Sequence, residues 1–97
     1  METTFTFRNI ESTEAIRQHT EGKLEKLKKY LLKPISAHVI FNVIKHNHQA
    51  EITLMANGGR YVGSAESTDM YASIDGAVDK IISQLKKDRE KTKGHRS

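Results

Sequence analysis

Residues 69–85 read DMYASIDGAVDKIISQL and have the most regular pattern of the chain. At about 100° per residue, the period of a helix, their apolar side chains fall in one arc. These side chains are Met70, Tyr71, Ile74, Ala77, Val78, Ile81, Ile82 and Leu85. Lys80 lies on one flank of this arc with Lys87 and Lys91, and Asp75 and Asp79 lie on the other. The pattern predicts a core-facing helix with one purely basic flank.

An earlier helix is predicted to have the same three sides. Ser12 or Thr13 is suited to cap its start, and Pro34 predicts that it ends at about Leu32. Its apolar arc contains Ile16, Thr20, Leu24, Leu27, Tyr30 and Leu31, and its basic flank contains Lys26, Lys29 and Lys33. Lys23 falls inside the apolar arc, where it must extend along the helix or meet a partner. The two basic flanks have the same hand, which predicts a joint basic surface.

Alternating side chains predict four strands, at about residues 3–8, 36–45, 50–56 and 60–66. Asn57 and Gly58 tolerate the positive φ angles of a tight hairpin between the last two. Gly63 and Ala65 are small, so a helix can lie close to the last strand. The order β-α-β-β-β-α predicts an α+β fold, with a parallel first strand pair and an antiparallel remainder. We expect a four-stranded mixed sheet with both helices on one face.

Length and charge limit the other possibilities. Ninety-seven residues predict one domain, which we place at residues 1–91, followed by a short, flexible basic tail at 92–97. The sequence has no cysteine, no apolar run long enough for a membrane span and no secretory signal pattern, so we expect a cytoplasmic protein without membrane contact. Residues 86–97 carry six basic and two acidic side chains, so the net charge of +4 arises there. The body is neutral, and attraction to a polyanion depends on how its charges are sorted.

No catalytic or metal-binding pattern stands out. His46 and His48 have the spacing of a metal pair but no third ligand nearby, and residues 57–59 lack the lysine and following helix of a phosphate loop. We therefore expect neither an enzyme nor a cofactor, metal or small-molecule substrate. Lysines spaced along helix faces suit the phosphates of structured RNA. All six aromatic side chains are assigned to the core, so recognition by base stacking is not indicated.

Several segments resemble the ribosome hibernation-promoting factor and ribosome-associated inhibitor (protein Y) family. They are residues 13–17, 23–30, 37–39, 58–59, 69–75, 78–81 and 84–87, and together they span nearly the whole chain. The family fold has the same element order as the one predicted from periodicity. Ser83 departs from the pattern, because relatives often carry arginine there.

The resemblance implies a stress and stationary-phase factor that binds the small ribosomal subunit and the whole ribosome. In that role the domain occupies the decoding groove, contacts 16S rRNA, and blocks messenger RNA and transfer RNA. Carried over by position, the rRNA-binding residues are Lys23, Lys26, Lys29, Lys33, Lys80, Lys86, Lys87, Arg89 and Lys91. One contact is then missing at Ser83 or moved to Arg89.

The chain ends soon after the last predicted helix, so it resembles the short type, which promotes ribosome dimerisation together with a small ribosome modulation factor. Other hypotheses remain open at this point. The protein could stabilise inactive single ribosomes without dimerisation, or bind double-stranded RNA in general. It could also regulate the transcription machinery, as an older name of the family suggests. For a hydrolase we find no catalytic residues.

Overall fold

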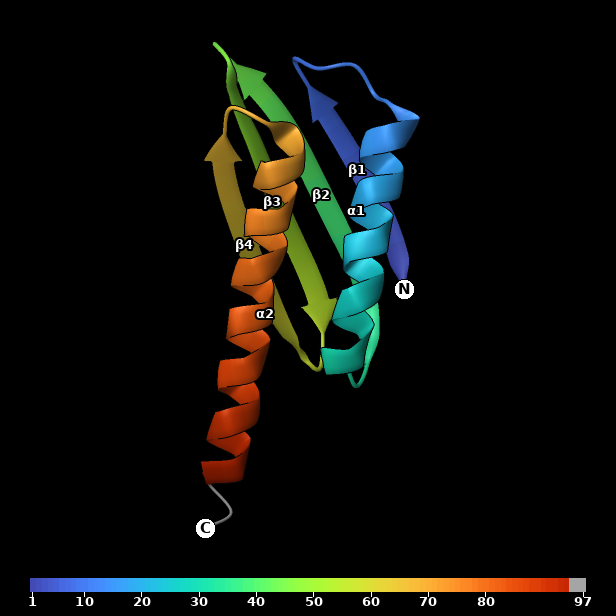
Figure 1. The fold of residues 1–97 in the computed structure, drawn as a ribbon. Helices are drawn as coiled ribbons and strands as arrows, with labels where there is room; N and C mark the ends of the chain where they lie inside the picture. Colours follow the sequence, from blue (N-terminus) through green and yellow to red (C-terminus); the bar gives the residue numbers. More distant parts are fainter. Residues whose placement is uncertain (95–97) are drawn as a thin grey trace.

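The computed structural model describes residues 1–94, apart from the side chains of residues 35 and 90–94 (Figure 1). Strand β1 (Glu2–Arg8) leads into helix α1 (Glu14–Leu27), which a 3₁₀ helix extends over Lys28–Tyr30. Strands β2 (Pro34–Ile44), β3 (Asn47–Ala56) and β4 (Gly59–Ser67) follow, and helix α2 spans Met70–Gly94. The predicted element order is confirmed.

The sheet has the strand order β1-β2-β3-β4. Strand β1 pairs in parallel with β2, with Phe5 opposite Val39, whereas β2, β3 and β4 form an antiparallel meander. Both helices cover the same face of the sheet and run in the same direction (Figure 1). The parallel pair is joined through α1, as the predicted βαβ unit requires.

The core lies between the helices and the covered face of the sheet. Phe7 stacks on Phe41 with a centroid separation of 4.7 Å, and Phe5 packs beside the same ring at 6.0 Å. The fully buried large side chains include Leu27, Val39, Phe41, Ile52, Leu54, Ile74 and Ile81. Each such side chain contributes about 2 kcal/mol through burial, which makes this layer the main source of stability.

Helix α2 lies unusually close to strand β4. A Cβ atom on Gly63 would stand 2.3 Å from the Ala77 carbonyl oxygen, and one on Gly76 would stand 2.9 Å from the Ala65 side chain. Side chains larger than hydrogen at these positions would push the helix away from the sheet. The predicted close approach at Gly63 and Ala65 is therefore confirmed.

Helix α1 is shorter than predicted, because it ends at Leu27 and its 3₁₀ extension ends at Tyr30. Leu31 is already extended, and the backbone N–H groups of Leu32 and Lys33 donate to the Asn57 side chain instead of to helical carbonyls. The start of α1 is as predicted, since the Thr13 hydroxyl accepts from the Ile16 N–H at 3.1 Å.

The structure differs from two further predictions. Tyr71 was assigned to the core but is 39% exposed, because its ring packs edge-on against His19 of α1 instead of under the helix. Helix α2 continues to Gly94, through the first residues of the predicted tail, and residues 95–97 lie outside the described residues.

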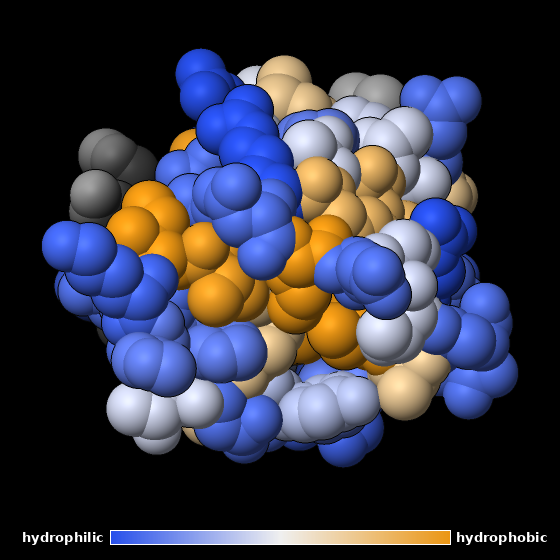
Figure 2. All heavy atoms as spheres, turned by 90° about the horizontal axis from the view of Figure 1, so that it is seen from above, coloured by the Kyte–Doolittle hydropathy of each residue, from blue (hydrophilic) through white to orange (hydrophobic). Residues whose placement is uncertain are grey.

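The two ends of the molecule differ in character. At the end where both helices begin, hydrophobic atoms reach the surface among hydrophilic ones (Figure 2). Here Ile10 and Val43 are only partly buried, and Ile44 is 48% exposed. At the other end the helices carry their lysine-rich segments. None of the helices described is long and apolar enough to cross a bilayer.

Candidate nucleic-acid interface

The parallel course of α1 and α2 brings their C-terminal halves to the same end of the molecule (Figure 1). This end carries the exposed side chains Lys26, Lys29, Lys33, Lys86, Lys87 and Arg89, which we call the basic end. Cations near helix C-termini are favourable because the carbonyl groups there carry partial negative charge. Six of the nine predicted binding residues therefore gather at one end.

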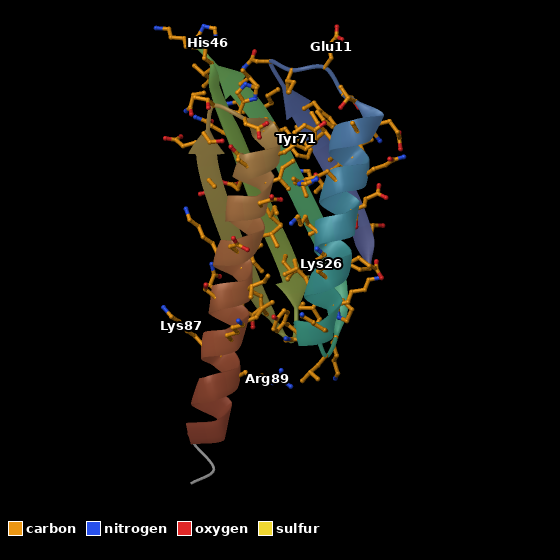
Figure 3. All side chains as sticks on the ribbon, in the orientation of Figure 1. Glu11, Lys26, His46, Tyr71, Lys87 and Arg89 are labelled. Carbon is orange, nitrogen blue, oxygen red and sulfur yellow. The ribbon has the colours of Figure 1, made fainter. Side chains whose placement is uncertain are left out.

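On the α1 side, the basic end is built from the last helical turn and the loop after it. Lys26 lies one turn beyond Lys23, on the side of α1 that faces α2 (Figure 3). The Lys29 ammonium lies 5.3 Å from the centroid of the Tyr30 ring, a cation–π distance. Lys33 follows in the loop, where its backbone N–H and C=O both bond to Asn57.

On the α2 side, the basic side chains begin where burial ends. Leu85 is 4% exposed, whereas Lys86, Lys87 and Arg89 are all exposed. In Figure 3, Lys87 points away from α1 and Arg89 points toward the side on which α1 ends. The helix therefore presents cations on more than one side. The ninth predicted residue, Lys91, has a side chain outside the described residues.

Lys23 is placed differently from the basic end. Its ammonium lies 3.4 Å from a carboxylate oxygen of Asp75 on α2, and the same oxygen is 2.8 Å from the His19 ring. Partial burial raises the pKa of the Asp75 carboxyl, but the His19 hydrogen bond and the Lys23 charge outweigh it and the net pKa is lowered. Lys23 thus finds the partner that its place in the apolar arc required, and its charge is largely compensated within the domain.

Lys80 lies on the outer flank of α2, beside the free edge of the sheet. Its ammonium donates to the backbone carbonyl of Ser64 in β4. One turn later, the Gln84 side chain donates to the Val62 carbonyl at 2.7 Å. An edge strand exposes such carbonyls to pairing with other chains, and these two side chains occupy them. Lys80 is therefore exposed but tied to the fold.

The remaining cations of the basic end are not tied in this way. Among the described residues, no ion pair involves Lys26, Lys33, Lys86, Lys87 or Arg89. No carboxylate whose side chain is described therefore pairs with these five charges, which leaves them available to phosphate groups. The predicted set divides into a basic end with six members and two lysines, Lys23 and Lys80, that also bind within the domain.

Three residues near the basic end, Asn57, Tyr61 and Asp88, are not predicted from the sequence to have a part in binding. Asn57 bonds to the loop after α1, and the Tyr61 hydroxyl donates to Asp88 of α2 at 2.6 Å. The sequence indicates Asn57 as a turn residue and Tyr61 as a core residue. The local pattern around each does not indicate which group the Asn57 side chain or the Tyr61 hydroxyl bonds to. As for metals, the described residues contain no group of three candidate ligands.

Comparison with known proteins gives consistent matches. Residues 3–93 match the profile of a family described as Sigma 54 modulation protein / S30EA ribosomal protein. The ribosome hibernation promoting factor of Escherichia coli K12 is 41% identical over 95 residues, which cover 98% of this chain and 100% of that protein. The factor of the same name from Pseudomonas putida KT2440 is 36% identical, over 94% of this chain and 89% of that protein.

Two solved structures have the same fold. The N-terminal domain of Thermus thermophilus protein Y has a TM-score of 0.84 and 35% identity, and the match covers 90% of this chain and 98% of that one. A ribosomal subunit interface protein from Coxiella burnetii has a TM-score of 0.83 and 26% identity, over 93% of this chain and 99% of that one.

Proposed function

This chain belongs to the Sigma 54 modulation protein / S30EA ribosomal protein family and is a non-enzymatic, ribosome-associated hibernation protein, and on that premise we propose how it acts. It occupies the decoding groove of the small subunit, binds 16S rRNA through its basic end, and blocks messenger RNA and transfer RNA. With a small ribosome modulation factor, it promotes ribosome dimerisation in the cytoplasm of starved or stationary-phase cells.

The observation that carries the proposal is the gathering of exposed cations at one end by two parallel helices, with no ion pair to them among the described side chains. Lysine acts as a point charge toward phosphate and needs no particular base. The domain is also narrow, with extents of 49 × 23 × 17 Å, a shape suited to a cleft between larger bodies. Phe5 and Phe7 pack on Phe41, so these rings are not available for base stacking. The surface therefore favours binding to the backbone and shape of folded RNA.

Salt dependence tests the electrostatic part of the proposal. The protein is expected to co-sediment with small subunits and whole ribosomes at low salt. If about five phosphates are neutralised, the logarithm of the affinity should fall with the logarithm of salt concentration at a slope near −4 to −5. A flat response would contradict binding through the basic end.

Charge reversal tests the location. The combined change of Lys26, Lys29, Lys80 and Lys87 to Glu is expected to abolish ribosome binding while leaving the fold intact, since all four side chains are exposed. A smaller pair gives a matched comparison: Lys26→Glu with Lys87→Glu, against Arg8→Glu with Lys45→Glu at the opposite end. Both pairs change the net charge equally. Equal loss of binding by the two pairs would refute the assignment to the basic end.

Ribosome profiles distinguish the forms that hibernation can take. If the protein promotes dimerisation, its addition with the modulation factor increases the dimer peak in a sucrose gradient. If it stabilises inactive single ribosomes, the single-ribosome peak grows and the dimer peak does not. A general RNA-binding module would be displaced from ribosomes by an excess of bare RNA duplex, and the proposed decoding-groove factor would not.

A further inference from the structure

The turn between β3 and β4 lies between the two halves of the basic end and bonds to the α1 side. Asn57 takes a left-handed conformation with φ of 54°, which asparagine tolerates better than most residues. Its side-chain oxygen accepts from the backbone N–H groups of Leu32 at 2.6 Å and Lys33 at 3.1 Å. Its own N–H donates to the Lys33 carbonyl at 3.1 Å. These bonds hold the loop that carries Lys33.

Strand β4, which follows this turn, bonds to the α2 part of the basic end. Tyr61 is 8% exposed, and its hydroxyl donates to the Asp88 carboxylate at 2.6 Å. Asp88 lies three residues beyond Leu85, in the segment where α2 no longer buries its side chains. The bond to Asp88 raises the pKa of Tyr61, as do burial and the carboxylate charge, while the Asn57 side chain lowers it. The Asn57 side chain and the Tyr61 hydroxyl therefore lie near each other at the β3–β4 turn.

Asp88 is an unexpected residue on a surface that binds phosphate. It stands among Lys86, Lys87 and Arg89, where a negative charge weakens attraction to a polyanion. Its bond to a nearly buried hydroxyl explains its place, because this contact fixes the helix segment next to the last buried turn. A carboxylate accepts such a bond more strongly than a neutral group does.

We propose that Asn57, Tyr61 and Asp88 are positioning residues, which hold residues 26–33 and 86–89 in one fixed arrangement for the phosphates of folded RNA. The inference rests on the proposed function of the basic end. It assigns to the β3–β4 turn the task of setting the spacing between two groups of cations on different helices. If both groups of cations are ordered before binding, less conformational entropy is lost when they bind the RNA.

Two substitutions of Asp88 separate position from charge. Asp88→Asn and Asp88→Ala both remove one negative charge, but only the amide retains an acceptor for the Tyr61 hydroxyl. If charge alone matters, the two variants bind ribosomes equally and more tightly than the unmodified protein. If Asp88 positions the helix, Asp88→Ala binds about 3- to 10-fold more weakly than Asp88→Asn. Equal affinities would overturn the proposal.

Tyr61→Phe tests the same bond without a change of charge. The affinity is expected to fall, and the salt slope to become shallower by about one for each phosphate that is no longer neutralised. A loss of stability alone would lower the folded fraction and leave the slope unchanged. In a double-mutant cycle, Tyr61→Phe and Asp88→Ala together should weaken binding no more than either does alone. Additive effects of the two changes would count against a shared role.

Asn57→Gly makes the corresponding test for the α1 side, since glycine suits the positive φ and lacks the side-chain acceptor. It is expected to lower ribosome affinity and make the salt slope shallower, as Tyr61→Phe does. Ribosome affinity and salt slope unchanged in Asn57→Gly would remove Asn57 from the proposal.

Distance measurement in the free protein tests positioning independently of ribosome binding. The chain has no cysteine, so spin labels can be attached solely at Leu32→Cys and Arg89→Cys. A narrow distribution of label distances is expected, which broadens when Tyr61→Phe or Asn57→Gly is added. A distribution that stays narrow refutes the positioning role even if ribosomes are bound. Broadening without ribosome binding by the unmodified protein would instead refute the proposed function, and with it the RNA role inferred here.

Discussion

Helix α2 has two parts that differ in what they contact. From Met70 to Leu85 it lies on the sheet, with Ile74, Ala77 and Ile81 fully buried and with no room for a side chain at Gly63 beneath it. From Lys86 to Arg89 the described side chains are exposed. The hydrogen bond between Tyr61 and Asp88 ties this second part to the sheet.

The difference separates stability from binding within one continuous helix. Burial of apolar surface is the dominant favourable term in folding, so changes in the first part should act on the free energy of unfolding. Exposed cations contribute little to stability but act directly on a polyanion. Substitutions in each part of α2 test this division.

Ile81→Ala is expected to lower the free energy of unfolding by about 2 to 5 kcal/mol, because it leaves a cavity between α2 and the sheet. The measurement is urea denaturation followed by circular dichroism. Lys86→Ala, in the second part of the same helix, serves as control and should change stability by less than about 0.5 kcal/mol. Similar losses of stability in both variants would show that the two parts are not separate in energy.

Gly63→Ala is expected to destabilise the protein by about 1 to 3 kcal/mol, because the new methyl group meets a backbone carbonyl that cannot move alone. Gly22→Ala in α1 is the matched substitution, and it is expected to stabilise the protein. Apart from its chain neighbours and the backbone of its own helix, no described atom lies within 4 Å of a Cβ at that position, and alanine in a helix is about 0.5 to 1 kcal/mol better than glycine. Thermal unfolding of both variants tests the pair. A stable Gly63→Ala protein would mean that the helix can shift on β4.

Lys87→Ala and Lys80→Ala compare the two parts on the same flank of the helix. Lys87→Ala should reduce ribosome affinity by about 3- to 10-fold and make the salt slope shallower by about one, with stability unchanged. Lys80→Ala should have a smaller effect on affinity, because Lys80 is already bonded to Ser64, and should leave an edge carbonyl of β4 open. Sedimentation at several salt concentrations measures both. A greater loss of affinity from Lys80→Ala would reverse the assignment.

Asp75→Asn tests a contact between the helices within the first part. The folded pKa of Asp75 is lowered from its ordinary value of 3.8, so the carboxylate contributes stability above that pH, and this contribution is lost as the pH falls through the folded pKa. The side chain is 42% exposed, which limits the effect to less than about 1 kcal/mol. Stability of both proteins between pH 2 and pH 7 measures it, with Asp79→Asn, exposed on the same helix, as control. A difference that grows toward acid pH would contradict the sign.

Much of the fold is predictable because it depends on periodic patterns. Alternation placed the four strands, the apolar arcs placed both helices on the covered face, and Gly63 indicated the close approach of α2. The predicted end of α1 is wrong because a polar side chain from a distant part of the sequence bonds to the backbone there. Asn57, some 25 positions along the chain, takes the N–H groups of Leu32 and Lys33 that a longer α1 would need. Local spacing does not indicate such a partner.

The candidate site was predictable as a set of residues but not as an arrangement. The basic flanks of both helices are visible in the sequence, and seven of the eight predicted binding residues whose side chains are described are exposed. The spacing also placed Lys23 in the apolar arc, where it needed a partner, but it could not name Asp75 as that partner or Ser64 as the acceptor for Lys80. Each of these contacts joins residues from different elements.

The element order, the covered face of the sheet and the sorting of charge around each helix follow from the sequence, because periodicity is a local property of the chain. Only the packing of distant segments shows that the helices run parallel toward the same end of the molecule, which lysines bond within the domain, and that Tyr61 donates to Asp88. These features depend on distances between segments far apart in the sequence. Such distances arise only when the helices pack on one face of the sheet and exclude water between them.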